Sequence, residues 1–167
     1  MNRNDFLNNI TVVISNANNP RTDFVLESPI KGTVLTFRAK LDNDKYGIIN
    51  STILKSLNIT GEEIAANAKI DEMDISDFFG MHYVTNANKM YGANVILDEN
   101  NRNEINRRFG KVWLLPSSIH EWIVVPYNDF SYDALKEMII SINKSDVSED
   151  EVLSDRPYIL DRGKIYV

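Results

Sequence analysis

The sequence predicts an α+β fold, a single domain with a mainly antiparallel sheet and three to four helices packed on it. Short runs of β-branched and aromatic residues, bounded by Pro, Gly or Asn, recur along the chain and are typical of strands. A helical apolar period near the C-terminus and two Ser/Thr-x-x-Glu sequences indicate helices. The chain has 167 residues, 43% of them hydrophobic, so it can bury a core of its own.

The N-terminal part, residues 1–45, is predicted to be rich in strands. Strands are expected at residues 10–14, 24–26 and 33–39, because each run is β-branched or aromatic and ends at a turn-forming residue. A polar turn is expected at residues 42–46. This part therefore reads as β-rich, and helices are expected only after it.

Two short helices are predicted next. The first spans residues 51–57, where Ile53, Leu54 and Leu57 share one helix face. The second follows Thr60, which forms a capping box with Glu63. An acidic, irregular connection is expected at residues 71–79. Its two aromatic residues are expected in the core together with both tryptophans: Phe78, Phe79, Trp113 and Trp122.

Residues 80–126 are predicted to form the central sheet. Its strands are expected at residues 82–85, 91–97, 112–115 and 122–125, and the first two are expected to pair as a hairpin. A helix is expected at residues 98–108, because acids lie at its start and Arg107 and Arg108 at its end, as the helix dipole favours. Gly110 then suits the helix stop.

The C-terminal part begins with an amphipathic helix at residues 131–143. Its apolar residues follow helical spacing: Tyr132, Leu135, Met138, Ile139 and Ile142. A second capping-box sequence, Ser148 to Glu151, opens a short acidic turn. Residues 157–160 and 164–167 are expected to pair as a terminal hairpin.

The composition excludes several classes of function. The chain has 24 acidic and 18 basic residues, a net charge of −6, which argues against direct binding to nucleic acid. It has no cysteine and two histidines, so a disulfide scaffold, a Cys-type zinc site and a thiol nucleophile are ruled out, and no metal is expected. Single, scattered glycines provide no phosphate loop, and no cofactor is expected. No leader or membrane segment is recognised, so we expect a cytoplasmic protein of undetermined oligomeric state.

One cluster has the residue types of acyl-transfer chemistry. Ser117 or Ser118 offers a hydroxyl nucleophile, His120 a base, and Glu121 a carboxylate to orient the base. Because such triads are assembled in space and these residues are adjacent in sequence, the alternative is a tight turn whose serines bind backbone amides. A small hydrolase or transferase centred on Ser117, His120 and Glu121 is therefore the alternative function.

Two charged clusters are further candidates. The basic residues Arg102, Arg107, Arg108 and Lys111 suit either an anion site or an ordinary helix C-terminus. The acidic residues form the predicted binding surface, and they are Asp146, Glu149, Asp150, Glu151 and Asp155. Acidic side chains of this kind compete for the basic groove of a nucleic-acid-binding protein. We therefore expect a non-enzymatic domain whose partner is a protein with a basic surface.

Several short sequences also follow one another in a recognisable order. They are Tyr83-Val84-Thr85-Asn86, Gly92-Ala93 with Ile96-Leu97, Leu115-Pro116-Ser117-Ser118-Ile119-His120-Glu121, and Leu153-Ser154-Asp155 with Tyr158 and Asp161-Arg162. In this order they resemble a family of unknown function from anaerobic Gram-positive bacteria and their mobile elements. The run at 115–121 is the specific part. The resemblance covers residues 80–162 and, more loosely, 48–68. It implies no activity, but it implies a phage or mobile-element setting, where small acidic proteins often inhibit host defence.

Overall fold

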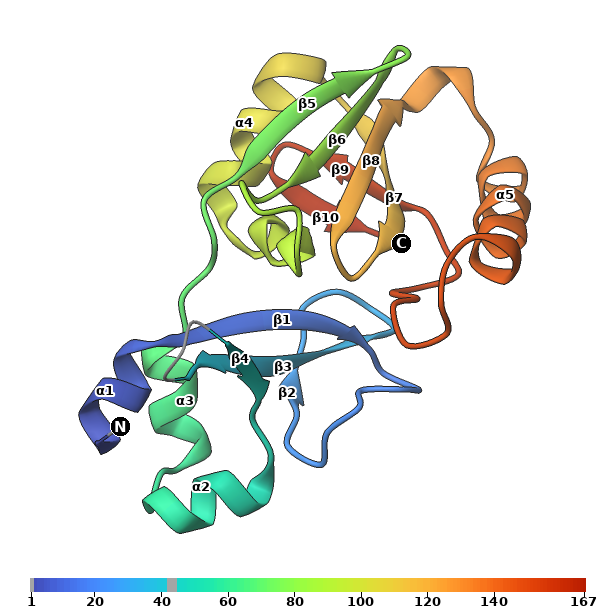
Figure 1. Ribbon diagram of the computed structural model, residues 1–167. Coiled ribbons are helices and arrows are strands. Elements are labelled where there is room, and N and C mark those ends of the chain that lie inside the picture. The colour runs from blue at the N-terminus through green and yellow to red at the C-terminus, as the bar shows by residue number, and fades with distance from the viewer. Residues whose placement is uncertain (1, 42–44) are drawn as a thin grey trace. The chain divides into compact units, whose positions relative to one another are not determined.

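A computed structural model describes residues 2–41 and 45–167 of the chain. It divides into two compact units, Met1–Ile70 and Asp71–Val167, called unit 1 and unit 2 below (Figure 1). Each unit has one antiparallel sheet with helices, so the predicted α+β class with mainly antiparallel sheet is confirmed. The strands form two sheets, one in each unit.

Unit 1 is built on a four-stranded sheet. Its elements are α1 (Arg3–Asn8), β1 (Ile10–Asn16), β2 (Leu26–Glu27), β3 (Thr33–Lys40), β4 (Tyr46–Ile48), α2 (Ser51–Leu57) and α3 (Gly61–Asn67). The order is β1-β3-β2, and β4 also pairs with β3. The register places Ile10 opposite Ala39 and Val12 opposite Phe37, and all four side chains are buried.

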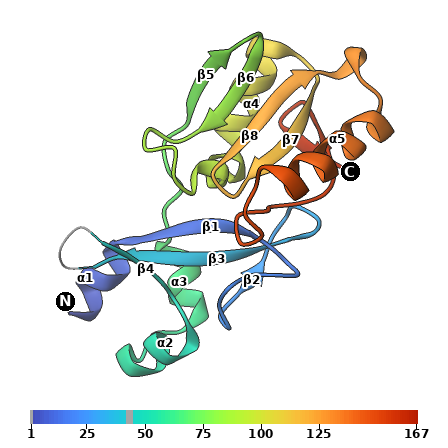
Figure 2. The same ribbon diagram turned by 45° about the vertical axis from the view of Figure 1, so that its right-hand side comes forward.

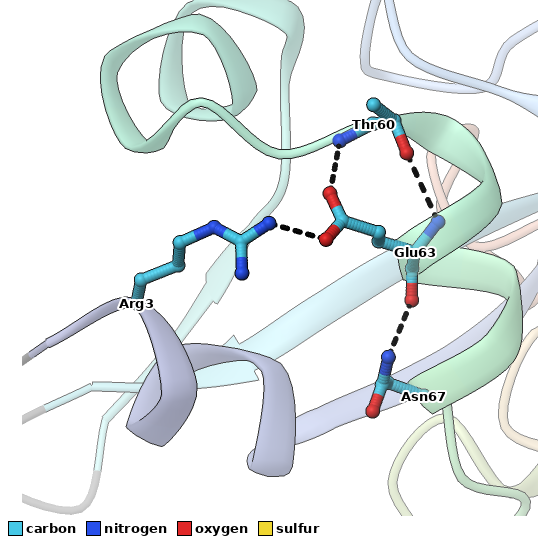
Figure 3. Close-up of polar contacts among 4 residues, drawn as sticks. All are labelled: Arg3, Thr60, Glu63 and Asn67. Atoms are coloured by element: carbon cyan, nitrogen blue, oxygen red, sulfur yellow. Dashed lines mark hydrogen bonds and ion pairs between the residues drawn. The ribbon is translucent and has the colours of Figure 1, made fainter.

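The helices of unit 1 are short and depend on their caps. Thr60 and Glu63 form the predicted capping box: the Thr60 side chain accepts the Glu63 amide, and the Glu63 carboxylate accepts the Thr60 amide (Figure 3). Arg3 of α1 also donates to that carboxylate. The Thr60 amide, followed by the Arg3 guanidinium, holds the pKa of Glu63 below its ordinary value. One carboxylate thus closes α3 and ties α1 to it.

Unit 2 is built on a six-stranded sheet of order β10-β9-β7-β8-β6-β5. Its elements are β5 (Asp74–Phe78), β6 (Met81–Thr85), the 3₁₀ helix η1 (Gly92–Leu97), α4 (Glu99–Phe109), β7 (Val112–Ser118), β8 (Glu121–Pro126), η2 (Tyr127–Asp129), α5 (Tyr132–Ser145), β9 (Tyr158–Asp161) and β10 (Lys164–Tyr166). All neighbouring strands are antiparallel. The two edges of the sheet are therefore β10 and β5.

The two faces of this sheet are covered differently. On one face, Trp113 and Leu115 of β7 pack with Leu135 and Ile139 of α5. On the other face lie η1 and α4, and the indole N–H of Trp122 donates to the Ala93 carbonyl (2.9 Å). Figures 1 and 2 show α4 and α5 on opposite sides of the sheet. The alternation of side chains along β7 and β8 supplies both cores.

Most predicted elements of the chain are confirmed. Five predicted strands form within a few residues of the expected bounds, and they were expected at 10–14, 33–39, 82–85, 112–115 and 122–125. The same holds for the predicted helices at 51–57, 98–108 and 131–143 and for the helix after Thr60. The terminal hairpin also forms. The strand expected at 24–26 is limited to Leu26 and Glu27. The turn expected at 42–46 lies mostly outside the described residues.

Three predictions in unit 2 are wrong. Residues 91–97 form η1 instead of a strand, because Tyr91 has φ 56° and starts a buried 3₁₀ helix, so no hairpin forms with residues 82–85. Residues 74–78, expected within an irregular connection, form the strand β5. Its acidic residues led to the wrong prediction, but charged residues are common on edge strands such as this one. Phe78 and Phe79 are 59% and 89% exposed and lie outside the core, whereas both tryptophans are buried.

Candidate functional site

The run at 115–121 forms the connection between β7 and β8. Ser118 pairs with Glu121, so Ile119 and His120 are the two turn residues, and the register shifts between Pro116 and Ser118. The Ser118 hydroxyl accepts the His120 backbone amide (3.0 Å) and is buried. Ser118 therefore stabilises the turn, as short polar side chains commonly do.

The imidazole of His120 is engaged at both nitrogens. Its Nδ1 accepts the Tyr91 backbone amide (2.8 Å), and its Nε2 lies 3.3 Å from a carboxylate oxygen of Glu151. Because a backbone amide is only a donor, Nδ1 must be unprotonated, and a neutral ring then carries its proton on Nε2, facing Glu151. This arrangement fixes the tautomer and leaves neither nitrogen directed at a hydroxyl.

Ser117 and Glu121 form a separate pair. The Ser117 hydroxyl donates to Glu121 Oε1 (3.3 Å), so its proton points at a carboxylate. A serine nucleophile of the Ser-His type requires the imidazole base within hydrogen-bond reach of the hydroxyl. The structure brings Ser117 and Glu121 together and directs His120 to Tyr91 and Glu151. The geometry therefore supplies a well-bonded turn and lacks the chain of contacts that acyl transfer needs.

The backbone of this turn joins three other segments of unit 2. The Thr85 hydroxyl donates to the His120 carbonyl (2.7 Å), and the Ala93 amide donates to the Ile119 carbonyl (3.4 Å). The Ile119 amide donates to the Glu151 carbonyl (2.9 Å). The turn thus holds the end of β6, the start of η1 and the segment after α5. We call these contacts, with those of the His120 ring, the turn network.

Gly92 lies at the tightest point beside the turn network. A Cβ atom at this position would lie 2.3 Å from the Thr85 hydroxyl oxygen and 2.5 Å from the Asn86 amide nitrogen. Asn86 is fixed in turn, because its side chain exchanges hydrogen bonds with the Met90 backbone (2.8 and 3.2 Å). Only glycine fits between these groups.

Ser154 and Tyr158 hold the segment between α5 and β9 against the sheet of unit 2. Their hydroxyl oxygens lie 2.9 Å apart, and both residues are buried. The Tyr158 ring meets the Trp122 ring edge to face, with centroids 5.8 Å apart. Burial raises the pKa of the Tyr158 phenol. This site is consequently neutral and structural at physiological pH.

The basic cluster is engaged inside unit 2. The Arg102 guanidinium donates to the backbone carbonyls of Gly163 (2.7 Å), Ile96 (3.0 Å) and Leu97 (2.9 Å). It therefore links α4 to η1 and to the terminal hairpin. Three of the five N–H donors of this guanidinium are thus used within unit 2 and are not available to a bound anion.

Arg107 and Arg108 are paired within α4. Their Nε atoms lie 2.7 and 2.6 Å from the Glu104 carboxylate. Hydrogen bonds from Arg107 and then Arg108 lower the pKa of Glu104 to about 2. The two arginines thus complement a carboxylate of their own helix, at the end where the helix dipole favours cations.

The predicted acidic residues lie between α5 and β9. Three of them are exposed and two are half-buried; the exposed ones are Asp146, Glu149 and Asp155, and the others are Asp150 and Glu151. Glu151 belongs to the turn network through His120. Unit 2 as a whole has 17 acidic and 10 basic residues, whereas unit 1 has 7 acidic and 8 basic. The net charge is therefore −7 in unit 2 and +1 in unit 1.

A surface hollow that sequence patterns do not predict lies beside the turn network. It has a volume of about 400 Å³ and is lined by Ser76, Asp77, Phe78, Tyr83, Thr85, Lys89 and Glu121. The sequence feature that bears on it is Phe-Phe-Gly at 78–80, because a glycine there suits a tight hairpin turn. In the structure Phe79 and Gly80 both have positive φ, as residues of such turns do. A hairpin there makes β5 an exposed edge with aromatic side chains.

Within residues 2–41 and 45–167, no helix is both long and apolar enough to cross a membrane. The same ranges contain no group of three or more His, Asp or Glu side chains placed to hold a metal ion. Unit 2 combines an α+β fold with a net negative charge, the turn network, and a hollow lined by aromatic and carboxylate side chains.

The chain belongs to a family of unknown function, DUF5688, whose model matches residues 49–162. The match runs from the end of β4 through α2 and α3 and over most of unit 2. It includes every segment of the turn network. The expected membership in a family of unknown function is therefore confirmed by a match over most of the chain. Comparisons with curated proteins and with solved structures gave no match.

Proposed function

We propose that this chain is a non-enzymatic protein-binding domain whose partner presents a basic surface. The partner class that suits it is a host protein that handles nucleic acid or serves in defence, and the domain acts as its modulator or inhibitor. A mobile element or phage is the proposed genetic source. The observation that carries the proposal is the concentration of negative charge in unit 2, −7 against +1 in unit 1.

Three acidic side chains that follow α5 in unit 2 are exposed to solvent. Asp146, Glu149 and Asp155 are exposed within ten residues of one another, between α5 and β9. By contrast, the guanidinium groups of Arg102, Arg107 and Arg108 are engaged in internal contacts. A field of one sign raises the rate at which a partner of the opposite sign associates.

The geometry of the turn at 115–121 supports a binding role over the hydrolase alternative. Ser117 donates to a carboxylate, and His120 accepts a backbone amide on the nitrogen that a general base would need. Acyl transfer would require both side chains to abandon these contacts. The proposal therefore assigns Ser117, His120 and Glu121 no catalytic step.

The test is capture of partners from a host lysate with two matched triple variants. One variant neutralises unit 2 (Asp146→Asn, Glu149→Gln, Asp155→Asn), and the other neutralises unit 1 (Asp5→Asn, Glu27→Gln, Glu62→Gln); all six carboxylates are exposed. Captured proteins are identified by mass spectrometry, and duplex DNA is added as a competitor.

We expect the unit 2 variant to lose a nucleic-acid-binding partner that the unit 1 variant retains. Raising the salt from about 50 to 500 mM should release this partner, because the screening length falls below about 5 Å. DNA should displace it as well. Equal retention by both variants, or a captured protein that neither salt nor DNA releases, would refute the proposal.

A further inference from the structure

One half of a sheet face in unit 2 has no helix over it. On this face, α5 packs against β7 through Leu135 and Ile139. The β5 and β6 half of the same face carries Ser76 and Tyr83, which pair directly in the register. The 400 Å³ hollow lies over this half. It is a concave surface, as binding sites for small groups commonly are.

Two aromatic rings line the hollow, and their planes are nearly perpendicular to one another. Phe78 and Tyr83 have ring centroids 6.4 Å apart and an interplanar angle of 73°. Phe79 packs edge to face on Phe78, at 4.4 Å and 81°, and restrains that ring although Phe79 is itself 89% exposed. Ring faces of this kind attract planar or compact cations.

A carboxylate shares the hollow with the two rings. Glu121 accepts one hydrogen bond, from Ser117, and a carboxylate has about four acceptor positions, so its other positions remain available to a ligand. Asp77 also lines the hollow and contacts the His82 ring. His82 is in turn stacked on Phe109 (4.1 Å), which fixes this side of the hairpin.

We infer that this hollow receives an arginine side chain of the protein partner. The guanidinium would stack on Phe78 or Tyr83 and donate to Glu121, a combination that arginine provides better than lysine because its group is planar and carries several donors. The inference rests on the proposed function, since it names the side chain by which a basic partner is recognised.

Lys89 gives the inference a sharp test. It lines the hollow and is exposed, and it has no ion pair within the part of the chain that the structure describes. Its ammonium would compete with an incoming guanidinium for Glu121. Removal of Lys89 should therefore strengthen binding of a cation and weaken binding of an anion, so one variant reports the sign of the ligand.

The experiment is an amide-resolved NMR titration of the full chain with Nα-acetyl-arginine methylamide. The neutral citrulline analogue is the matched control probe. The protein variants are Glu121→Gln, which preserves the Ser117 acceptor, Lys89→Ala, and Glu62→Gln, which removes an exposed carboxylate of unit 1.

We expect arginine to shift the signals of residues that line the hollow. Glu121→Gln should weaken the interaction roughly tenfold, the value of one charge-assisted hydrogen bond. Lys89→Ala should strengthen it, and Glu62→Gln should change it less than about twofold because exposed charges are screened. Equal shifts with citrulline, shifts confined to residues outside the hollow, or weaker binding by Lys89→Ala would each overturn the inference.

Partner capture separates failure of this inference from failure of the proposed function. If Glu121→Gln retains the captured partner while the triple variant of unit 2 loses it, the acidic surface binds without the hollow and the inference is refuted. If Glu121→Gln weakens both the arginine probe and the partner, with an unchanged amide spectrum elsewhere, the inference holds.

Discussion

The two units of this chain use their charged residues in opposite ways. Unit 1 has nearly balanced charge, and its best-defined polar contacts, around Thr60 and Glu63, close its short helices. Unit 2 carries a net −7, and around its turn at 115–121 the Thr85 hydroxyl and the Tyr91 amide both donate to His120. The exposed carboxylates Asp146, Glu149 and Asp155 lie outside these contacts. They remain available to a partner.

The largest effect is expected from paired glycine substitutions. Gly92→Ala should destabilise the protein by about 3 kcal/mol, the upper range for overpacking, because its Cβ would meet the Asn86 backbone at 2.5 Å. Gly61→Ala in unit 1 meets only ordinary contacts of 3.5 Å or more at the start of α3, and should be neutral or stabilising by roughly 0.5 kcal/mol. Urea unfolding curves measure both, and a smaller loss from Gly92→Ala than from Gly61→Ala would contradict the comparison.

A second prediction concerns the acceptor at His120. His120→Ala should cost about 2 kcal/mol, because it removes the side-chain acceptor of the Tyr91 amide in a half-buried site. His120→Asn should recover part of this loss, since its side-chain oxygen can replace Nδ1. Ser117→Ala should cost less than either, because the Ser117 hydroxyl donates one long hydrogen bond, of 3.3 Å, to Glu121. Chemical denaturation ranks the three variants, and the reverse ranking would show that the turn network does not depend on His120.

A third prediction tests the cap in unit 1. Thr60→Ala should destabilise the protein by about 1 kcal/mol, as loss of an N-cap typically does. Thr60→Ser keeps the hydroxyl and should preserve most of the stability. If the alanine and serine variants unfold at the same urea concentration, the capping box contributes nothing measurable.

The smallest effect is expected from the pH dependence of Glu104. Its pKa is lowered from 4.5 to about 2 by Arg107 and Arg108, so the folded state binds its proton less readily than the unfolded state does. The stabilisation from this carboxylate is complete above pH 4.5 and is lost as the pH falls towards 2. Glu104→Gln should flatten the stability profile in this window. Thermal unfolding at several pH values should show no such flattening for the exposed control Glu149→Gln.

Local sequence patterns predicted most of the fold. The capping box at Thr60 and the apolar period of α5 act within one or two turns of chain, so the sequence alone reveals them. The character of residues 91–97 was hidden, because an apolar run looks alike in a strand and in a buried 3₁₀ helix. The amide of Tyr91, which precedes η1, donates to His120, 29 residues away in the chain.

The candidate site was predictable only in part. Sequence patterns identify residues 115–121 as a candidate site and allow either a catalytic cluster or a tight turn there. They did not reveal that His120 contacts Glu151, because that pairing depends on the tertiary path after α5. The hollow was missed for the same reason: Phe78 and Tyr83 face one another only once β5 and β6 pair.

The central claim is that the negative charge of unit 2 attracts a basic partner. It is tested most directly by the salt dependence of the affinity for a nona-arginine peptide. Isothermal titration would compare the native chain with the two triple variants at four salt concentrations. We predict that the logarithm of the affinity falls with the logarithm of salt, that neutralising Asp146, Glu149 and Asp155 makes this slope shallower, and that neutralising the three unit 1 carboxylates leaves it unchanged. Equal slopes for the two variants would contradict the account.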